Sequence, residues 1–281
     1  MRIFLVACLL AAVVHSLQAD DTAAQTANKL LNKAKDALSK GDTEEALELA
    51  GQAIARDPKH EQGYLFRGVV YESLQRHAEA IQDFDKAIEL NPQAAEVYDR
   101  RGSEHFKLGH IQESLKDFDK FLRLRPAAKP GHWKRGISLY YAGRFEDGRK
   151  QFEGYQTVDS NDVENAVWRF LCMARESGVD KARSDMLKIG KDPRVPLMQI
   201  YALYRGQAKP EDVLDAVRQG QPNDSERKSR LFYAHLYLGL YAEVTGDKKK
   251  ALEHLKAAED LPIGGYMRDV AHVHRGLLEK K

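Results

Sequence analysis

A pattern that recurs every 34 residues constrains this chain more than any other feature. Between Glu61 and Asp162, glycines and phenylalanines repeat in register, and prolines keep the same step. The repeating positions are Gly68, Gly102 and Gly136, then Phe84, Phe118 and Phe152, then Pro58, Pro92 and Pro126. Each unit has room for two helices, and proline ends a helix because it has no N–H group and restricts the residue before it. The spacing therefore predicts an array of stacked helix pairs.

The unit that starts at Glu61 has the clearest set of large and small packing residues. These residues are Tyr64, Gly68, Tyr71, Ala80, Phe84, Ala87 and Pro92. The glycine and the alanine let two helices approach closely, and the aromatic ring fills the space beside them. The unit resembles a tetratricopeptide repeat. This resemblance implies an all-α fold, a right-handed superhelical solenoid of tetratricopeptide helix hairpins.

The repeat sets the domain boundaries. Four units, starting at Ala27, Glu61, Ala95 and Lys129, fill residues 27–162. Residues 20–26 are small and polar, which indicates a short disordered leader. Over residues 163–221 the period is lost although helical patterning continues, so we expect an irregular helical segment there. Residues 222–281 contain a final tetratricopeptide-like unit and a capping helix that covers the last apolar face.

Residues 1–19 have the composition of a signal peptide. A positive residue, Arg2, precedes a short apolar run, and Ala19 offers a small residue at a cleavage point. Export to the periplasm or the medium is predicted. Cys8 lies too early in the apolar run to be lipidated, which argues against a lipid anchor and leaves membrane contact in doubt. Removal of this segment leaves Cys172 as the one cysteine, so no intrachain disulfide is expected.

Composition and motifs argue against nucleic-acid binding, catalysis and metal binding. The net charge of +2 comes from an even mixture of signs, so nucleic acid is not an expected partner. The sequence has no phosphate-binding glycine loop, no nucleophile elbow and no paired cysteines. His272 and His274 stand two apart on a helix and point away from each other. We predict a protein that is not an enzyme, with no catalytic residue, metal ligand or cofactor.

A second resemblance covers residues 62–278. It is carried by the segment from Gly131 to Arg144, by Tyr155, by Asp159 to Asp162, and by Trp168 and Leu171. This stretch is similar to the NlpI-like tetratricopeptide adaptors of the bacterial cell envelope. The resemblance implies a non-catalytic, homodimeric adaptor whose partners are proteins or peptides, among them envelope proteases and peptidoglycan hydrolases. A self-associating structural subunit of an envelope assembly is the alternative function.

A repeat array of this kind binds partners along the first helices of its units. The predicted groove residues are Leu65, Val69, Asp99, Phe106, Trp133, Ile137, Tyr140 and Tyr141. The fourth unit is rich in aromatic residues, and tryptophan and tyrosine offer large rigid contact areas that suit a binding hot spot. In the alternative interpretation, Trp133 and Tyr140 pack against middle helices that fold over the groove.

Overall fold

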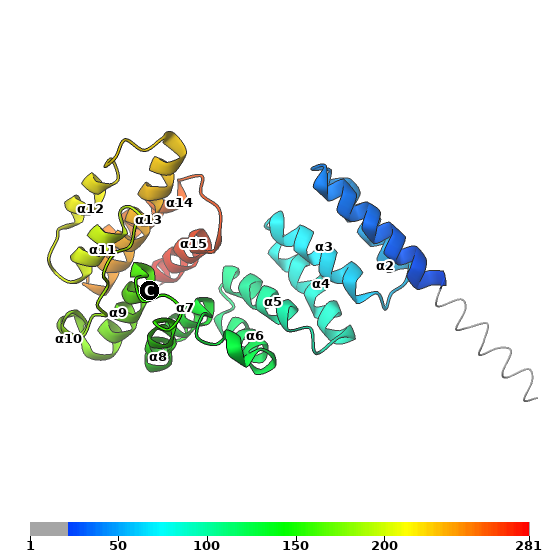
Figure 1. Cartoon of the computed structure of the whole chain (residues 1–281), viewed down its shortest axis with the longest axis horizontal. Helices are drawn as coiled ribbons and strands as arrows, with labels where there is room; N and C mark the ends of the chain where they lie inside the picture. The colour runs from blue at the N-terminus through cyan, green and yellow to red at the C-terminus, as the bar shows by residue number, and fades with distance from the viewer. Residues whose placement is uncertain (1–21, 281) are drawn as a thin grey trace, which may run out of the picture. The chain divides into compact units, whose positions relative to one another are not determined.

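The computed structural model describes residues 22–280, and all regular structure in that range is helical. The predicted all-helical repeat fold is confirmed. Two compact units divide the chain, with the boundary between Glu104 and His105. Figure 1 shows the helices that make up the two units. The predicted signal peptide, residues 1–19, lies outside the described residues.

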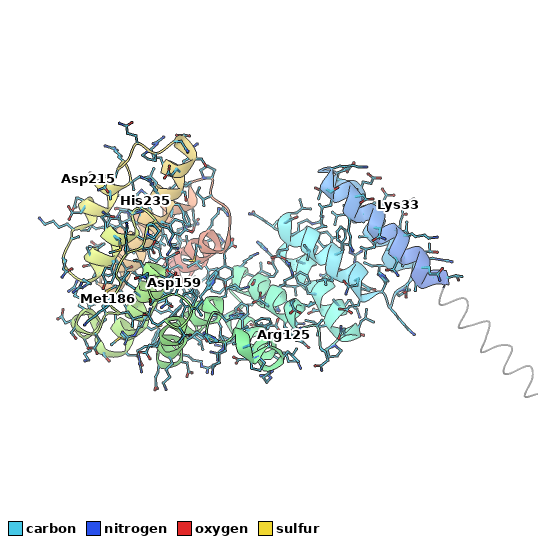
Figure 2. The ribbon with its side chains drawn as sticks, in the orientation of Figure 1. Lys33, Arg125, Asp159, Met186, Asp215 and His235 are labelled. Carbon is cyan, nitrogen blue, oxygen red and sulfur yellow. The ribbon has the colours of Figure 1, made fainter. Side chains whose placement is uncertain are left out.

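The first unit contains a helix over residues 22–39 followed by α2 (Thr43–Arg56), α3 (Glu61–Ser73) and α4 (His77–Leu90). Helix α5 (Ala95–Lys107) begins in this unit and crosses the boundary. Alanines such as Ala34 and Ala50 are fully buried here, because a small side chain lets neighbouring helices pack closely. Charged side chains such as Lys33 lie on the outer faces (Figure 2).

The first helix begins earlier than the sequence indicated. The expectation of a disordered leader is wrong for residues 22–26, which are helical, while residues 20 and 21 lie outside the described range. The hydroxyl group of Thr26 donates a hydrogen bond to the carbonyl of Thr22 at 2.8 Å, within the first turns of the helix. Ala23 and Ala24 favour helix strongly, and their propensity outweighs the polar composition that suggested disorder.

The second unit begins with the end of α5 and continues through α6 (Ile111–Leu124), the short helix η1 (Pro126–Ala128), α7 (Trp133–Tyr141) and α8 (Phe145–Tyr155). Its middle part is α9 (Val163–Ser177), α10 (Val179–Ser184), α11 (Leu197–Tyr204) and α12 (Pro210–Ala216). The chain ends with α13 (Asp224–Val244), α14 (Lys248–Glu259) and α15 (Tyr266–Glu279). None of the helices over residues 22–280 is both long and apolar enough to cross a bilayer.

Glycines hold the hairpins of both units together. A Cβ atom on Gly68 would lie 2.7 Å from a ring carbon of Phe84, and one on Gly136 would lie 2.6 Å from a ring carbon of Phe152. Gly239 takes the same part in the α13–α14 hairpin, where Leu255 replaces the phenylalanine. Each glycine thus removes the side chain that would separate its two helices.

The period of 34 residues extends further than the sequence indicated. Helices α4, α6, α8 and α10 begin at residues 77, 111, 145 and 179, and α9 begins at residue 163, in register with α3 and α5. The expectation that the period is lost from Val163 is therefore wrong for α9 and for the start of α10. A phenylalanine, Phe170, occupies the position of the repeat glycine in α9, which hid the repeat.

Arginines mark the same register. Arg67, Arg101, Arg135 and Arg169 stand 34 residues apart. The last three each bond an acidic side chain 16 residues earlier, on the preceding helix pair, whereas Arg67 bonds Asp83, 16 residues later. Arg275 of α15 repeats the arrangement with Glu259 of α14 at 2.9 Å. Helix α15 therefore follows the α13–α14 hairpin as the first helix of a further repeat would.

Candidate functional site

The fourth repeat carries an aromatic cluster on the side of α7 that the sequence assigned to a groove. The rings of Tyr140 and Tyr141 meet edge to face with their centroids 5.3 Å apart, and Trp168 of α9 lies edge-on to Tyr140 at 5.6 Å. Tyr140 is only 5 % exposed. Burial raises the pKa of the Tyr140 and Tyr141 hydroxyl groups, so both stay protonated and available as hydrogen-bond donors.

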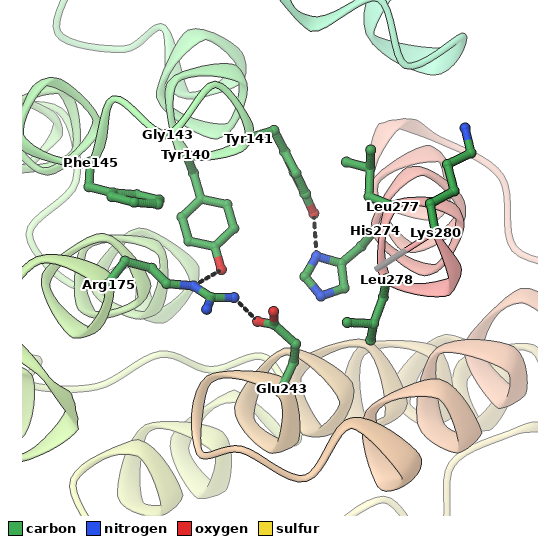
Figure 3. Close-up of a pocket in the computed structure, with 10 residues that line it drawn as sticks. All are labelled: Tyr140, Tyr141, Gly143, Phe145, Arg175, Glu243, His274, Leu277, Leu278 and Lys280. Atoms are coloured by element: carbon green, nitrogen blue, oxygen red, sulfur yellow. Dashed lines mark hydrogen bonds and ion pairs between the residues drawn. The ribbon is translucent and has the colours of Figure 1, made fainter.

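Helix α15 covers this cluster. The hydroxyl group of Tyr141 is 3.0 Å from Nδ1 of His274 (Figure 3). Near the start of α15, the ring of Tyr266 stacks on Phe106 at 5.1 Å and meets the ring of Trp133 edge to face at 5.2 Å. The alternative interpretation, in which middle helices cover these residues, holds for Tyr140, which packs on Trp168 of α9 within residues 163–221. The C-terminal helix instead contacts Trp133 and Tyr141.

The predicted groove residues fall into two groups. Phe106, Ile137 and Tyr140 are at most 5 % exposed, so these three predicted groove residues offer almost no accessible surface to a partner. They form part of the core of the second unit, because α9 and α15 pack over them. Trp133 and Tyr141 are half-buried against the same core.

In the first unit, the predicted groove residues are partly accessible, although Leu65 and Val69 also pack against the core of that unit. Leu65 and Val69 are half-buried on α3, and Asp99 is half-buried on α5. Glu72 lies on the same face of α3 as Leu65 and Val69 and forms an ion pair of 2.7 Å with Arg100 of α5. This face, which we call the α3 face, is defined by Leu65, Val69 and Glu72.

A cavity of about 570 Å³ lies beside the aromatic cluster and is shown in Figure 3. The residues that line it are Tyr140, Tyr141, Gly143, Phe145, Arg175, Glu243, His274, Leu277, Leu278 and Lys280. Inside it, Nε of Arg175 donates to the Tyr140 hydroxyl group at 3.2 Å, and the same guanidinium group is paired with Glu243 of α13. Burial alone would lower the pKa of Arg175, but Tyr140 and Glu243 raise it, so the guanidinium stays charged.

A second cavity of about 250 Å³ lies on another side of the cluster, and we call it the Trp168 cavity. The residues that line it are Trp133, Ile137, Phe152, Tyr155, Asp162, Glu164, Asn165, Trp168, Arg194, Tyr233 and Met267. Arg194 bonds Asp162 at 2.8 Å, Glu164 at 2.7 Å and Asp192 at 2.6 Å. Arg194 lowers the pKa of Asp192 although burial opposes the shift, so that carboxylate is charged.

Cys172 is the cysteine of the described residues, and its surroundings make its thiol unreactive. Cys172 is fully buried against Gly148, and burial raises the pKa of its thiol well above the ordinary value. A thiol in that state is a poor nucleophile. Across residues 22–280, no three His, Cys, Asp or Glu side chains are grouped so that they could hold a metal ion.

Sequence reasoning missed several lining residues of both cavities. Arg175, Glu243 and Arg194 come from helices and loops outside the four units, and no motif marks them. The signal that the sequence did contain is the 34-residue step of the arginines, which runs through Arg169 and would have extended the repeat into α9.

Comparisons with known proteins agree with this geometry. The profile of the tetratricopeptide repeat family matches residues 31–95 and 100–163. These segments belong to the tetratricopeptide repeat family. A search of curated proteins found no match.

Solved tetratricopeptide structures share the fold. A tetratricopeptide repeat protein from Parabacteroides merdae aligns over 91 % of this chain and 99 % of its own, with 15 % identity and a TM-score of 0.56. MamA from Desulfovibrio magneticus aligns over 57 % of this chain and 90 % of its own, with 18 % identity and a TM-score of 0.52. At these identities, the likeness concerns the fold alone. Tetratricopeptide arrays are protein-interaction scaffolds, and that coarse function applies to this chain.

Proposed function

We propose that this chain is an exported scaffold that holds other proteins together in the cell envelope, in the manner of the NlpI-like adaptors. The observation that carries the proposal is the α3 face. Of the equivalent positions in the second unit, Ile137 and Tyr140 are buried and Trp133 is half-buried, whereas Leu65, Val69 and Glu72 all stay partly accessible on α3. Partly exposed apolar side chains beside an ion pair form the mixed surface that protein interfaces use.

The finer parts of the proposal rest on sequence. The composition of residues 1–19 supports export to the periplasm or the medium. The likeness to NlpI-like adaptors between Gly131 and Leu171 supports envelope partners, among them proteases and peptidoglycan hydrolases, and a homodimer. Binding without turnover is the expected activity.

Site-specific photo-crosslinking tests the α3 face. A photoreactive amino acid is placed at Leu65 or Val69 and, as the control, at Lys86, whose side chain is 56 % exposed on α4. In an envelope extract from the organism that encodes the chain, we expect discrete protein adducts from Leu65 and Val69 and none of these adducts from Lys86. The same adducts from all three positions, or none from α3, would contradict the assignment.

Two measurements on the native protein test the proposed export and the proposed dimer. Its mass is expected to correspond to a chain that begins at Asp20, and a mass that includes residues 1–19 or a lipid would contradict cleaved, unanchored export. Light scattering is expected to give a dimer. Assemblies that grow with concentration would instead support a self-associating structural subunit.

A further inference from the structure

The larger cavity of the second unit, which we call the Arg175 cavity, combines an apolar lining with a charged group that a ligand can reach. Its volume of about 570 Å³ lies within the roughly 300–1,000 Å³ of pockets that enclose small molecules. Phe145, Leu277 and Leu278 supply apolar surface. The guanidinium group of Arg175 lies between Tyr140 and the carboxylate from α13 (Figure 3), and the Arg175 side chain is 29 % exposed.

The hydrogen-bonding capacity of Arg175 is only partly used. A guanidinium group has five N–H donors. Nε of Arg175 donates one of them to the hydroxyl oxygen of Tyr140 at 3.2 Å, and Nη2 is paired with Glu243. Within residues 22–280, no further side chain or carbonyl accepts a hydrogen bond from Arg175. Both N–H groups of Nη1 and one of Nη2 are therefore available, and the exposed fraction of the side chain makes them reachable.

The two existing contacts hold the guanidinium group in place. Tyr140 approaches it from α7 and Glu243 approaches it from α13, so two helices fix the position of a side chain that belongs to a third. A fixed, planar guanidinium group binds a planar carboxylate through two parallel hydrogen bonds, and it loses less conformational entropy than a freely rotating side chain would.

The charges of the lining residues favour an anion. Arg175 and Lys280 are permanently positive at neutral pH, and Glu243 is the carboxylate among the lining residues. Lys280 is exposed, whereas the side chain of Glu243 is 7 % exposed and is already paired with Arg175. The charge that an entering ligand meets is therefore mainly positive.

The apolar lining narrows the class of anion. A phosphate or sulfate ion has oxygens on all sides, so several of them would lie against Phe145, Leu277 or Leu278 without a hydrogen bond, which is unfavourable. A monocarboxylate carries its charge at one end, and the rest of the molecule can be apolar. Only the second kind of anion matches both parts of this cavity.

We propose that the Arg175 cavity binds a monocarboxylate with an apolar body. The carboxylate accepts hydrogen bonds from Nη1 of Arg175 and from the N–H group of Nη2 that Glu243 leaves unused. The apolar body lies against Phe145 and Leu277. Such a ligand is either an acyl chain with a free carboxylate or the C-terminal, apolar residue of a polypeptide. The cavity belongs to the second unit and the α3 face to the first, so this inference stands apart from the proposed function.

Isothermal titration calorimetry on the full-length chain tests the proposal with two carboxylates. Octanoate represents an acyl chain, and N-acetyl-leucine represents the C-terminal residue of a polypeptide. Octanamide and N-acetyl-leucinamide are their neutral counterparts of nearly the same shape. Octylammonium has the same chain length as octanoate with the opposite charge.

We expect saturable binding of at least one carboxylate, at least tenfold weaker binding of its amide, and no binding of octylammonium. A charge-assisted hydrogen bond contributes enough free energy for a tenfold difference. Tighter binding of octanoate supports an acyl chain, and tighter binding of N-acetyl-leucine supports a C-terminal residue. If neither carboxylate binds saturably, the proposal is wrong. Equal affinity for a carboxylate and its amide, or for octanoate and octylammonium, would also overturn it.

A double variant connects binding to the guanidinium group. Arg175→Gln alone would leave Glu243 buried without its partner, which destabilises a protein. It is therefore combined with Glu243→Gln, so that two neutral side chains replace the ion pair. We expect at least tenfold weaker binding of the carboxylate. Arg205→Gln is the matched control, because Arg205 is an exposed arginine of the same unit that does not line the cavity, and it should leave the affinity unchanged.

Leu277→Asp provides a second test that leaves the ion pair intact. Leu277 is half-buried in the wall of the cavity, and a carboxylate at this position would repel an anionic ligand. We again expect at least tenfold weaker binding of the carboxylate, with circular dichroism showing that each variant is folded. Unchanged affinity in either folded variant would contradict binding at this cavity.

Discussion

The second and fourth repeats have the same packing inside their hairpins but differ in how buried one face of the first helix is. Position by position, 68 residues apart, Gly68 corresponds to Gly136 and Phe84 corresponds to Phe152. On the first helix of each hairpin, Leu65, Val69 and Glu72 of α3 correspond to Trp133, Ile137 and Tyr140 of α7. The former remain partly accessible, whereas Ile137 and Tyr140 are buried.

This comparison shows that different residues of a repeat determine the packing within its hairpin and the packing of the hairpin against its neighbours. The glycine and the aromatic residue determine how the two helices of a hairpin pack. The opposite face of the first helix determines what the hairpin packs against next. In the fourth repeat that face is aromatic and is covered by α9 and α15, so it stabilises the fold instead of remaining open to partners.

Truncation of the corresponding residues Ile137 and Val69 should give the largest contrast. Ile137 is 1 % exposed, so Ile137→Ala is expected to lower the free energy of unfolding by about 2–5 kcal/mol. Val69 is half-buried, so Val69→Ala is expected to cost about 1 kcal/mol. Urea unfolding followed by tryptophan fluorescence reports the second unit, which contains both tryptophans, and circular dichroism reports the whole chain. Equal losses from the two substitutions would remove the distinction between the two faces.

The close contacts of Gly68 and Gly136 should contribute equally to the stability of the second and fourth repeats. A Cβ atom at Gly136 or Gly68 would lie within 3 Å of a phenylalanine ring, so Gly136→Ala and Gly68→Ala are each expected to cost about 1–3 kcal/mol in free energy of unfolding. This loss exceeds the gain in helix propensity of about 1 kcal/mol from replacing glycine.

Gly276 provides the matched control for these glycine substitutions. It lies inside α15, and no atom lies within 4 Å of the position that an added Cβ would take, so Gly276→Ala should stabilise the chain by about 1 kcal/mol. Thermal and urea unfolding of the three variants measure these changes. Stabilisation by Gly136→Ala would show that the ring of Phe152 moves aside freely.

The sequence predicted the part of the fold that repeats. Gly68, Phe84 and their equivalents recur because every hairpin has the same internal packing, so a single chain contains several copies of the signal. Where one copy changes, the signal is lost while the geometry persists. Phe170 replaces the repeat glycine, yet Arg169 still bonds Glu153 at 3.0 Å as the register requires.

The candidate site was less predictable because it depends on contacts between distant parts of the chain. The sequence drew attention to Tyr140 and Tyr141 through their composition, but it left open whether a partner or the chain itself contacts them. The pairing of Tyr141 with His274 spans 133 residues and follows no period. The packing of α9 decides the question for Tyr140, and the packing of α15 decides it for Tyr141.

The polar contacts of Glu72 on α3 and of Tyr140 on α7 should differ in how their contribution to the free energy of unfolding responds to salt. Glu72 and Arg100 have side chains that are 24 % and 42 % exposed, so Glu72→Gln is expected to cost at most about 1 kcal/mol at low salt. At about 1 M salt, this cost should largely disappear because exposed charges are screened.

Tyr140 provides the buried counterpart of Glu72. Tyr140→Phe removes the acceptor of the hydrogen bond from Arg175 and is expected to cost about 1 kcal/mol at either salt concentration. Urea unfolding of both variants at low and high salt checks the contrast. A loss in Tyr140→Phe that vanishes with salt would indicate that solvent reaches the cluster.

The turns within the hairpins should give the smallest effect, with opposite signs in the two repeats. The residue between the helices has a positive φ in both, +57° at Gln75 and +73° at Gly143. A residue with a Cβ atom is disfavoured in this conformation, whereas glycine adopts it readily. Gln75→Gly is therefore expected to raise the free energy of unfolding by roughly 0.5–1 kcal/mol. Gly143→Gln should lower it by a similar amount, because nothing lies within 4 Å of its added Cβ and only backbone strain is introduced. Thermal unfolding of the two single variants measures both shifts, and a change of the same sign in both would mean that side-chain contacts, rather than the turn conformation, determine stability at this position.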